Sequence, residues 1–256
     1  MKELSNAFPP FEPKRQGFSR QPIWNQIRDY IIGCLGKGVW EAGDMLPSEK
    51  ELSVALGVAS GTVRRALDSL VEDGILSRIQ GRGTFVKSFK SHGYTNPFHR
   101  FFFDKTNSIV PFEMRVVRYE TVPVTHAVVP ARVLNLAYDQ TLIHALRVFS
   151  WEGRDVGISE LWLDSRRFSK MTKANLANRS SSLYSYYESE LGVSVVSVSD
   201  TIKAKIFDET LASLGNFKVG APYLELTRIG RTFEDVPVEY RLSYCLSDDF
   251  HMVFGA

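Results

Sequence analysis

The sequence predicts an α+β chain of two domains, a small mainly helical domain followed by a larger domain built on an antiparallel sheet. The 256 residues allow one large domain or two modest ones. Apolar residues recur at helical spacing up to about residue 74 and follow strand-like patterns beyond residue 98. The intervening KSFKSHGYTNPFH is polar and interrupted by Gly and Pro. We therefore expect a first domain at 18–88, a linker at 89–97 and a second domain at 98–256.

Charge is distributed unevenly between these domains. The formal net charge is only +2, but residues 14–90 contain twelve basic and eight acidic residues, whereas the rest of the chain is slightly acidic. Hydrophobic residues make up 44% of the chain, which is enough for a sizeable core. The charge asymmetry indicates that the first domain meets a polyanion.

Cysteine usage and hydropathy narrow the class of protein. Cys34 and Cys245 form no CxxC pair, so we expect neither a disulfide framework nor a zinc site. For each cysteine, burial as a small apolar side chain is favoured over a redox role. The first thirty residues show no secretory signal pattern, and no run of 18 apolar residues occurs. We expect a cytoplasmic protein with no membrane contact, metal or cofactor.

Three helices are expected in the first domain. Ile23, Ile27 and Ile31 recur at helical spacing. In LPSEKELSVALG, Ser48 and Glu51 have the spacing of a capping box. We expect Gly57 to end this second helix in the left-handed conformation. The third helix has its apolar face at positions i, i+3, i+4, i+7 and i+8, which are Val63, Ala66, Leu67, Leu70 and Val71.

The order of these elements predicts a winged helix-turn-helix. Two helices joined by a tight turn form the helix-turn-helix, whose second helix enters the major groove by its N-terminal end. The following ILSRIQGRGTFV predicts a hairpin of 75–79 with 84–86, in which Arg82 lies between two glycines. An arginine held in this way can approach a narrow groove closely. A helix-turn-helix pattern alone also occurs in ordinary helical proteins, and a winged helix can serve RNA or protein contacts.

Residues 22–88 resemble the GntR family of bacterial winged-helix regulators. The stretches that carry the resemblance are PIWNQIRDYI, GDMLPSEKELSVALGV, TVRRALDSLVEDGIL and RIQGRGTFV, in this order. The resemblance implies a repressor that binds a short palindromic operator in double-stranded DNA as a homodimer. It also implies that Lys50, Arg64 and Arg82 contact the DNA.

The turn into the third helix departs from the family pattern, which has Ser-Arg where this chain has Ala59-Ser60. In relatives the serine caps the helix and the arginine reads a guanine. Here we expect Ser60 to cap the helix one position later and Gly61 to allow close backbone approach, with Thr62 and Arg65 on the same DNA-facing surface. One arginine–guanine contact contributes about 1–3 kcal/mol of discrimination between base pairs. Without it we expect a different operator sequence or a weaker sequence preference, whereas the affinity that comes from phosphate contacts remains.

The second domain reads as paired strands with interspersed helices. FEMRVVRYETVPV is a strand, and TLIHALRVFSWEGRDVGISELWLD predicts a hairpin turning at residues 152–155. SSLYSYYESELG predicts a helix, and APYLELTRIGRTFEDVPVEYRLSYCL predicts a final hairpin turning at residues 234–235. This order is typical of an antiparallel α+β sheet domain.

This half resembles the UTRA effector domain of the HutC branch of the GntR family. The matching stretches are RFFF, SSLYSYYESELGV, VGAPYLELTRIG and VPVEYRLSY, with Arg147 and Glu160 on either side of a hairpin turn. The resemblance implies a fold similar to chorismate lyase and a small-molecule effector that releases the protein from DNA. The effector contacts it implies are Arg147, Glu160, Ser182 and Glu239, and we expect Phe101, Phe103 and Phe149 as aromatic walls.

Two alternatives remain open for this half. Arg147 and Glu160 on neighbouring strands would also make a structural ion pair across the hairpin. An enzyme is the rival class because the fold is shared with a lyase. No Ser-His-Asp set, metal cluster or phosphate-binding loop is found in the sequence, so we expect a regulator and not an enzyme.

The ligand expectation rests on two departures from the relatives that bind sugar phosphates. Those relatives tend to carry Arg-x-Arg where this chain has Arg147-Val148-Phe149, and Cys245 replaces a tyrosine. One anion anchor and one phenol are therefore missing, which favours a less charged or partly aromatic effector.

Overall fold

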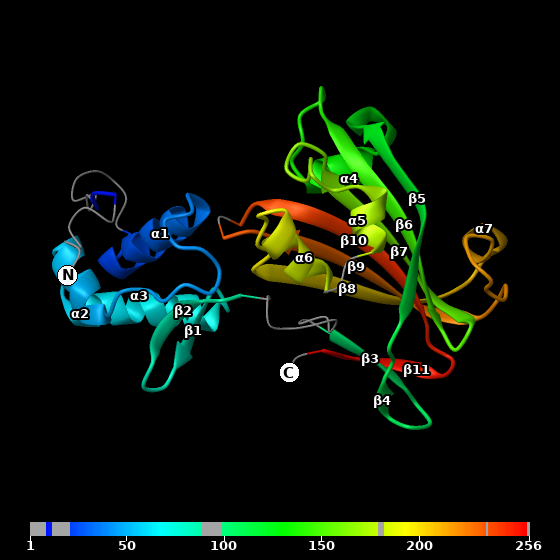
Figure 1. Ribbon diagram of the computed structural model, residues 1–256, viewed down its shortest axis with the longest axis horizontal. Coiled ribbons are helices and arrows are strands. Elements are labelled where there is room, and N and C mark those ends of the chain that lie inside the picture. The colour runs from blue at the N-terminus through cyan, green and yellow to red at the C-terminus, as the bar shows by residue number, and fades with distance from the viewer. Residues whose placement is uncertain (1–8, 12–20, 89–98, 179–181, 234, 255–256) are drawn as a thin grey trace. The chain divides into compact units, whose positions relative to one another are not determined.

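The computed structural model describes residues 9–11, 21–88, 99–178, 182–233 and 235–254, and the chain divides into two compact units (Figure 1). The first unit comprises residues 1–88 with the short segment 232–235, and the second comprises residues 89–231 and 236–256. The expected linker at 89–97 lies outside the described residues. Each unit is considered by itself below.

The first unit contains three helices and a two-stranded hairpin. They are α1 (Ile23–Gly36), α2 (Glu49–Leu56), α3 (Ser60–Glu72), β1 (Leu76–Ile79) and β2 (Gly83–Val86). The helices form as their apolar stripes predict, since Ile27, Ile31, Leu52, Val63 and Leu67 are all buried. The elements therefore occur in the order of a winged helix-turn-helix.

Local capping fixes the ends of α2. The Ser48 hydroxyl accepts a hydrogen bond from the Glu51 amide, and a Glu51 carboxylate oxygen lies 2.8 Å from the Ser48 amide, which is the predicted capping box. Gly57 ends the helix with φ +64°, the left-handed conformation that glycine adopts most easily. The turn between α2 and α3 is thus set by local sequence.

The wing is an antiparallel hairpin whose tip depends on glycine. Ile79 pairs with Gly83 at the last rung, and the chain reverses through residues 80–82. Gly81 and Gly83 have φ of +73° and +123°, which place Arg82 at the exposed tip. The residues expected at the turn are therefore those that form it.

The second unit is built on one six-stranded antiparallel sheet with strand order β5-β6-β7-β10-β9-β8. The strands are β5 (Glu113–Pro123), β6 (Thr141–Trp151), β7 (Arg154–Asp164), β8 (Ser197–Ile206), β9 (Pro222–Arg231) and β10 (Pro237–Leu246). The two hairpins expected from the sequence, β6–β7 and β9–β10, are present in this sheet. The antiparallel α+β prediction is confirmed.

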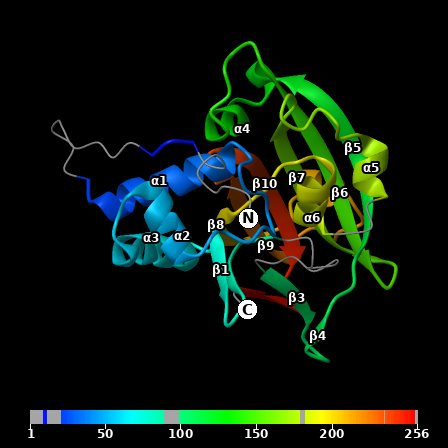
Figure 2. The same cartoon turned by 60° about the vertical axis from the view of Figure 1, so that its left-hand side comes forward.

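Two helices cover one face of this sheet, which we call the inner face. They are α5 (Lys173–Ala177) and α6 (Leu183–Glu190), and Figure 2 shows α6 lying against the strands. Leu183, Tyr184 and Tyr187 of α6 pack with Ala145 and Leu161 of the sheet in one buried cluster. Side chains along β6 point alternately to the two faces, so Arg147, two residues after Ala145, also belongs to the inner face.

The opposite, outer face has separate covers. One end carries η2 (Val124–His126) and α4 (Val128–Val133), which pack on Leu142 and Tyr240. The other end carries α7 (Glu209–Ala212) and a small sheet of β3 (His99–Phe103), β4 (Ser108–Ile109) and β11 (Phe250–Phe254). The second unit therefore has distinct hydrophobic clusters on its two faces.

A buried carboxylate ties the end of the β6–β7 hairpin to its surroundings. Both terminal nitrogens of Arg115 lie 2.7 Å from the Asp155 oxygens, and the Ser150 hydroxyl and Asn216 amide donate to the same carboxylate at 2.8 Å. The Arg115 guanidinium is the main cause that lowers the Asp155 pKa from 3.8 to about 2, against the effect of burial. Asp155 therefore favours the folded state while it is ionised.

We expect Asp155→Asn to lower the free energy of unfolding at pH 7 by about 1–2 kcal/mol, discounted because Arg115 is half exposed to solvent. A carboxyl whose folded pKa is depressed stabilises the protein above its unfolded pKa. The difference between the wild type and the variant should therefore shrink as pH falls from about 4 to about 2. Urea unfolding across this range measures it. Asp139→Asn, at an exposed position, is the control, and an equal pH profile for both variants would contradict the assignment.

Candidate nucleic-acid interface and effector site

The N-terminus of α3 presents small, accessible residues. The N-cap is Ala59, whose side chain makes no capping hydrogen bond, and Ser60 is already the first helical residue. The expectation that Ser60 caps the helix is therefore wrong, because a cap needs an extended backbone before the helix and Ala59 has it. Ser60 and Gly61 are exposed and Thr62 is partly buried. This end of α3 is open to a partner.

Arg64 is held in place by a carboxylate of α2. Its Nε lies 2.8 Å from Glu49, whose other oxygen accepts a hydrogen bond at 2.9 Å from Arg78 of β1. Arg78 also contacts Asp68 of α3 at 2.7 Å. Arg64 nevertheless remains 65% exposed. Glu49 thus orients Arg64 through Nε alone, a contact that sequence reasoning missed because the partners lie fifteen residues apart.

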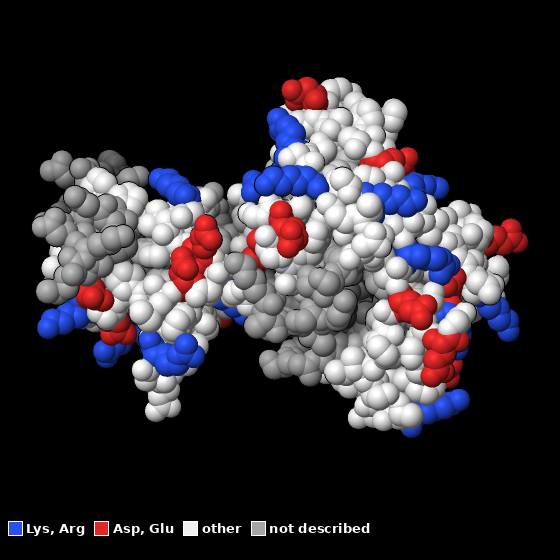
Figure 3. Space-filling model, in the orientation of Figure 1, with Lys and Arg blue, Asp and Glu red and all other residues white. Residues whose placement is uncertain are grey.

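Arg64 and Arg82 line one hollow of about 660 Å³ in the first unit. Its walls come from the start of α2, from Arg64 and from the tip of the wing, where Arg82 lies 5.7 Å from the ring of Phe85. Basic side chains gather along the edge of the first unit beside the wing (Figure 3). The two arginines expected to contact DNA therefore belong to the same surface.

Two other predicted contacts lie elsewhere on the first unit. The guanidinium of Arg65 lies 4.7 Å above the ring of Trp24 of α1, in a cation–π contact, and does not line the hollow. Lys50 is exposed on α2 but is also absent from the walls of the hollow. The structure therefore groups Arg64 with Arg82 and separates Arg65 from them.

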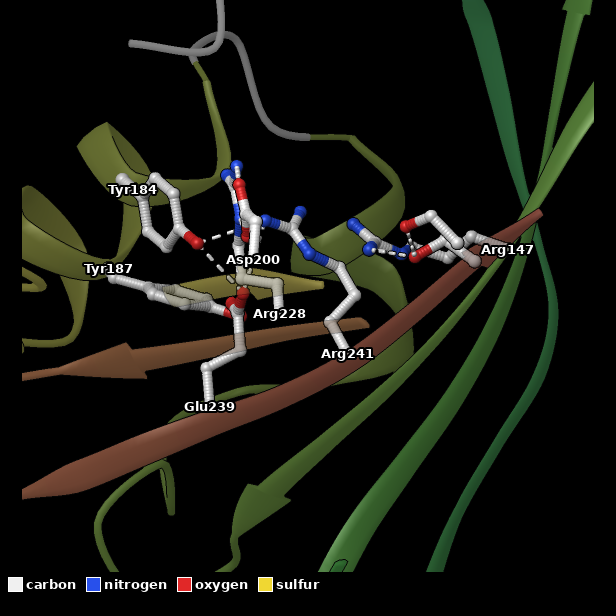
Figure 4. A network of polar contacts seen from close by, with 9 residues as sticks. Arg147, Tyr184, Tyr187, Asp200, Arg228, Glu239 and Arg241 are labelled. Atoms are coloured by element: carbon white, nitrogen blue, oxygen red, sulfur yellow. Dashed lines mark hydrogen bonds and ion pairs between the residues drawn. The ribbon is translucent and has the colours of Figure 1, made fainter. Parts of the chain in front are cut away.

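On the inner face of the second unit, Glu239 is fully buried and fully hydrogen-bonded (Figure 4). One oxygen accepts from the Tyr184 hydroxyl at 2.8 Å and the other from Tyr187 at 3.0 Å. Nη2 of Arg241 lies 3.1 Å from Glu239 and 2.9 Å from the Tyr184 hydroxyl. Two tyrosines of α6 and two residues of β10 thus form one network between helix and sheet.

Further arginines enter the same layer from neighbouring strands. Arg228 of β9 is fully buried and pairs through Nε and Nη2 with Asp200 of β8. Arg147 of β6 donates to the Ser159 hydroxyl at 2.8 Å and lies over the ring of Phe149. Burial raises the pKa of both tyrosines that contact Glu239. Burial is the largest single effect on Arg241 and acts to lower its pKa, but Glu239, Tyr184, Tyr187 and Asp200 together outweigh it and the pKa is raised. The inner face is therefore a cationic, buried polar layer.

Ser182 and Glu239, two of the expected effector contacts, belong to this layer with Arg147. Ser182 is buried at the N-cap of α6 and accepts a hydrogen bond from the Ser185 amide at 3.2 Å. It therefore lies at the beginning of the helix that covers the inner face. The structure brings these three predicted residues to one face of the sheet.

Glu160 is not among them. The β6–β7 hairpin turns tightly at Glu152 and Gly153, both with positive φ, and a register shift follows between Phe149 and Ser150. As a result Arg147 lies opposite Ser159, and Glu160 lies opposite Leu146. Side chains alternate between faces, so Glu160 projects from the outer face. The expectation that Glu160 faces an effector beside Arg147 is wrong, and so is the alternative of an ion pair between them.

Glu160 instead belongs to a network on the outer face. It accepts from the Tyr244 hydroxyl at 3.1 Å and lies 3.4 Å from Nε2 of His144, whose ring stacks on Trp162 at 3.8 Å. The contact with His144 is the main cause that lowers the Glu160 pKa, and it outweighs burial. These residues hold the outer face of neighbouring strands together.

Phe101 and Phe103 belong to an aromatic cluster that also contains Phe149. Phe101 stacks on Phe250 with ring centroids 5.1 Å apart, and Phe103 contacts Trp151 at 4.6 Å. Both belong to the cluster that also contains Val148, a residue of the outer face. Phe112 links this cluster to Phe149, with its ring 5.2 Å from that of Phe101 and 5.8 Å from that of Phe149, and the expectation that Phe101 and Phe103 wall the effector site stays a prediction. Phe149 is the aromatic residue that contacts Arg147.

Sequence reasoning missed four members of the inner-face layer, which are Tyr184, Tyr187, Arg228 and Arg241. Strand alternation carried a usable signal, since Glu239 and Arg241 lie two residues apart on β10 and must share a face. The tyrosines lie at i and i+3 on one side of a helix. What was missing was the pairing of β10 with β7 and of β9 with β8, in addition to the predicted pairing of β9 with β10.

Comparison with known proteins agrees with both units. The profile of the UTRA domain matches residues 111–251, and that of the gntR family of bacterial regulatory proteins matches residues 24–86. The chain belongs to the GntR family. Its second unit carries the UTRA domain of the HutC branch, so the predicted fold class, a winged helix-turn-helix followed by an antiparallel effector domain, is confirmed.

The relatives of this GntR-family regulator are transcriptional regulators. It is 25% identical to the fructoselysine utilization operon transcriptional repressor of Escherichia coli (strain K12), over 89% of this chain and 92% of that one. It is 27% identical to the mannosyl-D-glycerate transport/metabolism system repressor of the same organism, over 90% and 94%. The ligand-binding domain of a GntR-family regulator from Bordetella bronchiseptica is 27% identical, with a TM-score of 0.58 over 64% of this chain and 99% of that one.

These relatives make the GntR-family chain a transcriptional regulator and not an enzyme. Across the described residues, no helix has the length and hydropathy needed to cross a membrane. In this family the first domain binds DNA and the UTRA domain binds effectors.

We expect Tyr187→Phe to lower the free energy of unfolding by about 1–3 kcal/mol, because it leaves one oxygen of the buried Glu239 without a donor. Tyr138→Phe, at a residue 84% exposed, is the matched control and should change it by less than about 0.5 kcal/mol. Urea unfolding of both variants measures the difference, and equal stabilities would contradict the role assigned to Tyr187.

Proposed function

We propose that this regulator is a repressor that binds a palindromic operator as a homodimer and is released by a small metabolite. The DNA contacts are made at the hollow lined by the start of α2, by Arg64 of α3 and by the wing. The effector binds on the inner face of the UTRA domain. Such a protein acts in the cytoplasm, on chromosomal DNA.

The observation that carries the DNA-binding proposal is that Arg64 and Arg82 line the same hollow with exposed guanidinium groups. In a helix-turn-helix, residues near the start of the second helix reach base edges in the major groove. Arg64 lies in the second turn of α3, so its Nη groups are suited to a guanine. Arg82 between two glycines is suited to the backbone or the neighbouring minor groove. Ser60, Gly61 and Thr62 then allow close approach of the helix terminus.

Lys50 and Arg65 have a lesser part in the proposal. Lys50 is exposed at the start of α2 and is suited to a phosphate contact at the edge of the site. Arg65 lies on Trp24 and contributes positive potential without a direct base contact. A homodimer follows because one winged domain covers only a half-site, and two half-sites about one helical turn apart form a palindrome.

The effector proposal rests on Arg147, Ser182 and Glu239 sharing the inner face of the UTRA domain. Relatives are named for fructoselysine utilization and for mannosyl-D-glycerate transport and metabolism. These names favour a small carbohydrate-derived metabolite here too. Effector and operator bind different arrangements of the dimer, so each lowers the affinity for the other by the same factor.

We expect Arg64→Ala and Arg82→Ala each to weaken operator binding about 5- to 150-fold, the equivalent of about 1–3 kcal/mol. Arg64→Ala should also relax sequence preference, whereas Arg82→Ala should mainly lower the salt dependence of binding, by about one counterion. Fluorescence anisotropy on a duplex selected from a random pool measures both. Arg65→Ala should weaken operator binding less than either of these two substitutions.

Arg167→Ala is the control for this experiment, because Arg167 is an exposed arginine of the UTRA domain. Wild-type affinity in both the Arg64 and Arg82 variants would refute the placement of the DNA at the hollow. Equal retention of RNA of matched charge would refute duplex DNA as the partner.

A further inference from the structure

We propose that Glu49 determines the DNA specificity of this regulator, because it confines Arg64 to contacts with bases and lowers the affinity for the phosphate backbone. This role rests on the proposed function, in which Arg64 meets the operator. An acidic side chain on a surface that binds a polyanion is unfavourable for affinity, so its presence calls for another effect. Glu49 is a positioning residue and not itself a DNA contact.

Arg64 is the arginine of α3 that is available to DNA. The helix begins with Ser60, whose side chain is short, and contains two arginines. The guanidinium of Arg65 lies 4.7 Å above the ring of Trp24 and does not line the hollow. Arg64 lines the hollow and is 65% exposed. Base recognition by a long side chain of α3 therefore depends on how Arg64 presents its donors.

Glu49 occupies one edge of the Arg64 guanidinium. This group has five N–H donors in a planar fork, so it can bind a pair of acceptors along its Nε side or between its two Nη groups. A Glu49 oxygen accepts a hydrogen bond from Nε at 2.8 Å. Within the part of the chain that the structure describes, neither Nη group of Arg64 has a hydrogen-bond partner. What remains is the pair of Nη groups, which matches O6 and N7 of guanine.

The second oxygen of Glu49 is held from the wing. It accepts a hydrogen bond at 2.9 Å from Nη2 of Arg78 in β1, and Nη1 of Arg78 lies 2.7 Å from Asp68 of α3. Glu49 is 25% exposed, far less than Arg64. Both of its oxygens have arginine donors, so a rotation that released Arg64 would also break the contact with Arg78. Arg78 therefore acts as a brace for Glu49.

The formal charges of this cluster balance. Glu49 and Asp68 carry two negative charges, and Arg64 and Arg78 carry two positive ones. Phosphate contacts owe their strength to positive charge, and a like charge beside the bound group is unfavourable. Glu49 therefore weakens a contact between Arg64 and a phosphate, whereas a guanine edge has no formal charge and is repelled much less. The result is a lower affinity for any DNA and a larger difference between the operator and other sequences.

The test measures binding of the full chain and its variants to two fluorescent duplexes of equal length at constant ionic strength. One duplex carries an operator that the wild type selects from a random pool, and the other carries a scrambled sequence of the same composition. Anisotropy gives a Kd for each duplex, and the ratio of the two Kd values measures specificity. We expect Glu49→Gln to bind the scrambled duplex about 2- to 5-fold more tightly and to lower the ratio at least about fivefold.

Glu72→Gln is the matched control, because it removes the same charge from an exposed position at the end of α3. It should tighten binding to both duplexes by a similar factor and leave the ratio unchanged. Urea unfolding of both variants should give midpoints close to that of the wild type, because ion pairs in solvent add little stability.

A double-mutant cycle with Arg64→Ala separates positioning from a general structural role. If Glu49 acts through Arg64, adding Glu49→Gln to Arg64→Ala should lower the ratio less than about twofold. A structural role of Glu49 would lower the ratio by the same factor whether or not Arg64 is present.

Two results would overturn the role of Glu49. One is a Glu49→Gln variant that keeps the wild-type ratio, and the other is an equal fall of the ratio with and without Arg64. Arg64→Ala alone tests the proposed function separately. If that variant binds the operator like the wild type, the placement of DNA at the hollow is wrong. If it binds more weakly while Glu49→Gln keeps the wild-type ratio, the placement stands and only the role of Glu49 fails.

Discussion

The effector domain depends on the burial of one carboxylate, that of Glu239. A charge removed from water is tolerated only when every oxygen has a donor, and here two tyrosines of α6 and an arginine of β10 provide them. The same bonds fasten α6 to the sheet and fix the position of Arg241. The geometry of the inner face follows from this requirement.

The DNA-binding domain uses a carboxylate in a comparable way, but at the surface. Glu49 joins α2 to α3 and to the wing through Arg64 and Arg78. In solvent such pairs add little stability, so their effect is one of orientation. Arg64 is left 65% exposed, and Glu49 contacts it through Nε. In both domains an acidic side chain thus fixes the position of basic groups on neighbouring elements.

Much of the fold could be predicted from local sequence because its causes are local. The capping box of Ser48 and Glu51, the left-handed Gly57 and the glycines around Arg82 each act within a few residues. The N-cap of α3 was missed by one position, since Ala59 takes the extended backbone without a side-chain bond. That difference leaves Ser60 free at the helix terminus.

The sequence by itself determined the two-domain order, the three helices with their wing, and the antiparallel hairpins, because apolar periodicity and turn chemistry are properties of short segments. Only the tertiary structure decided which polar residues meet. A tight turn at Glu152 and a shift after Phe149 moved Glu160 to the outer face, and the pairing of β10 with β7 brought Arg241 to the inner face that also bears Arg147. The physical reason is that a change of one residue in register moves a side chain across the sheet, and register depends on contacts between strands that are distant in sequence.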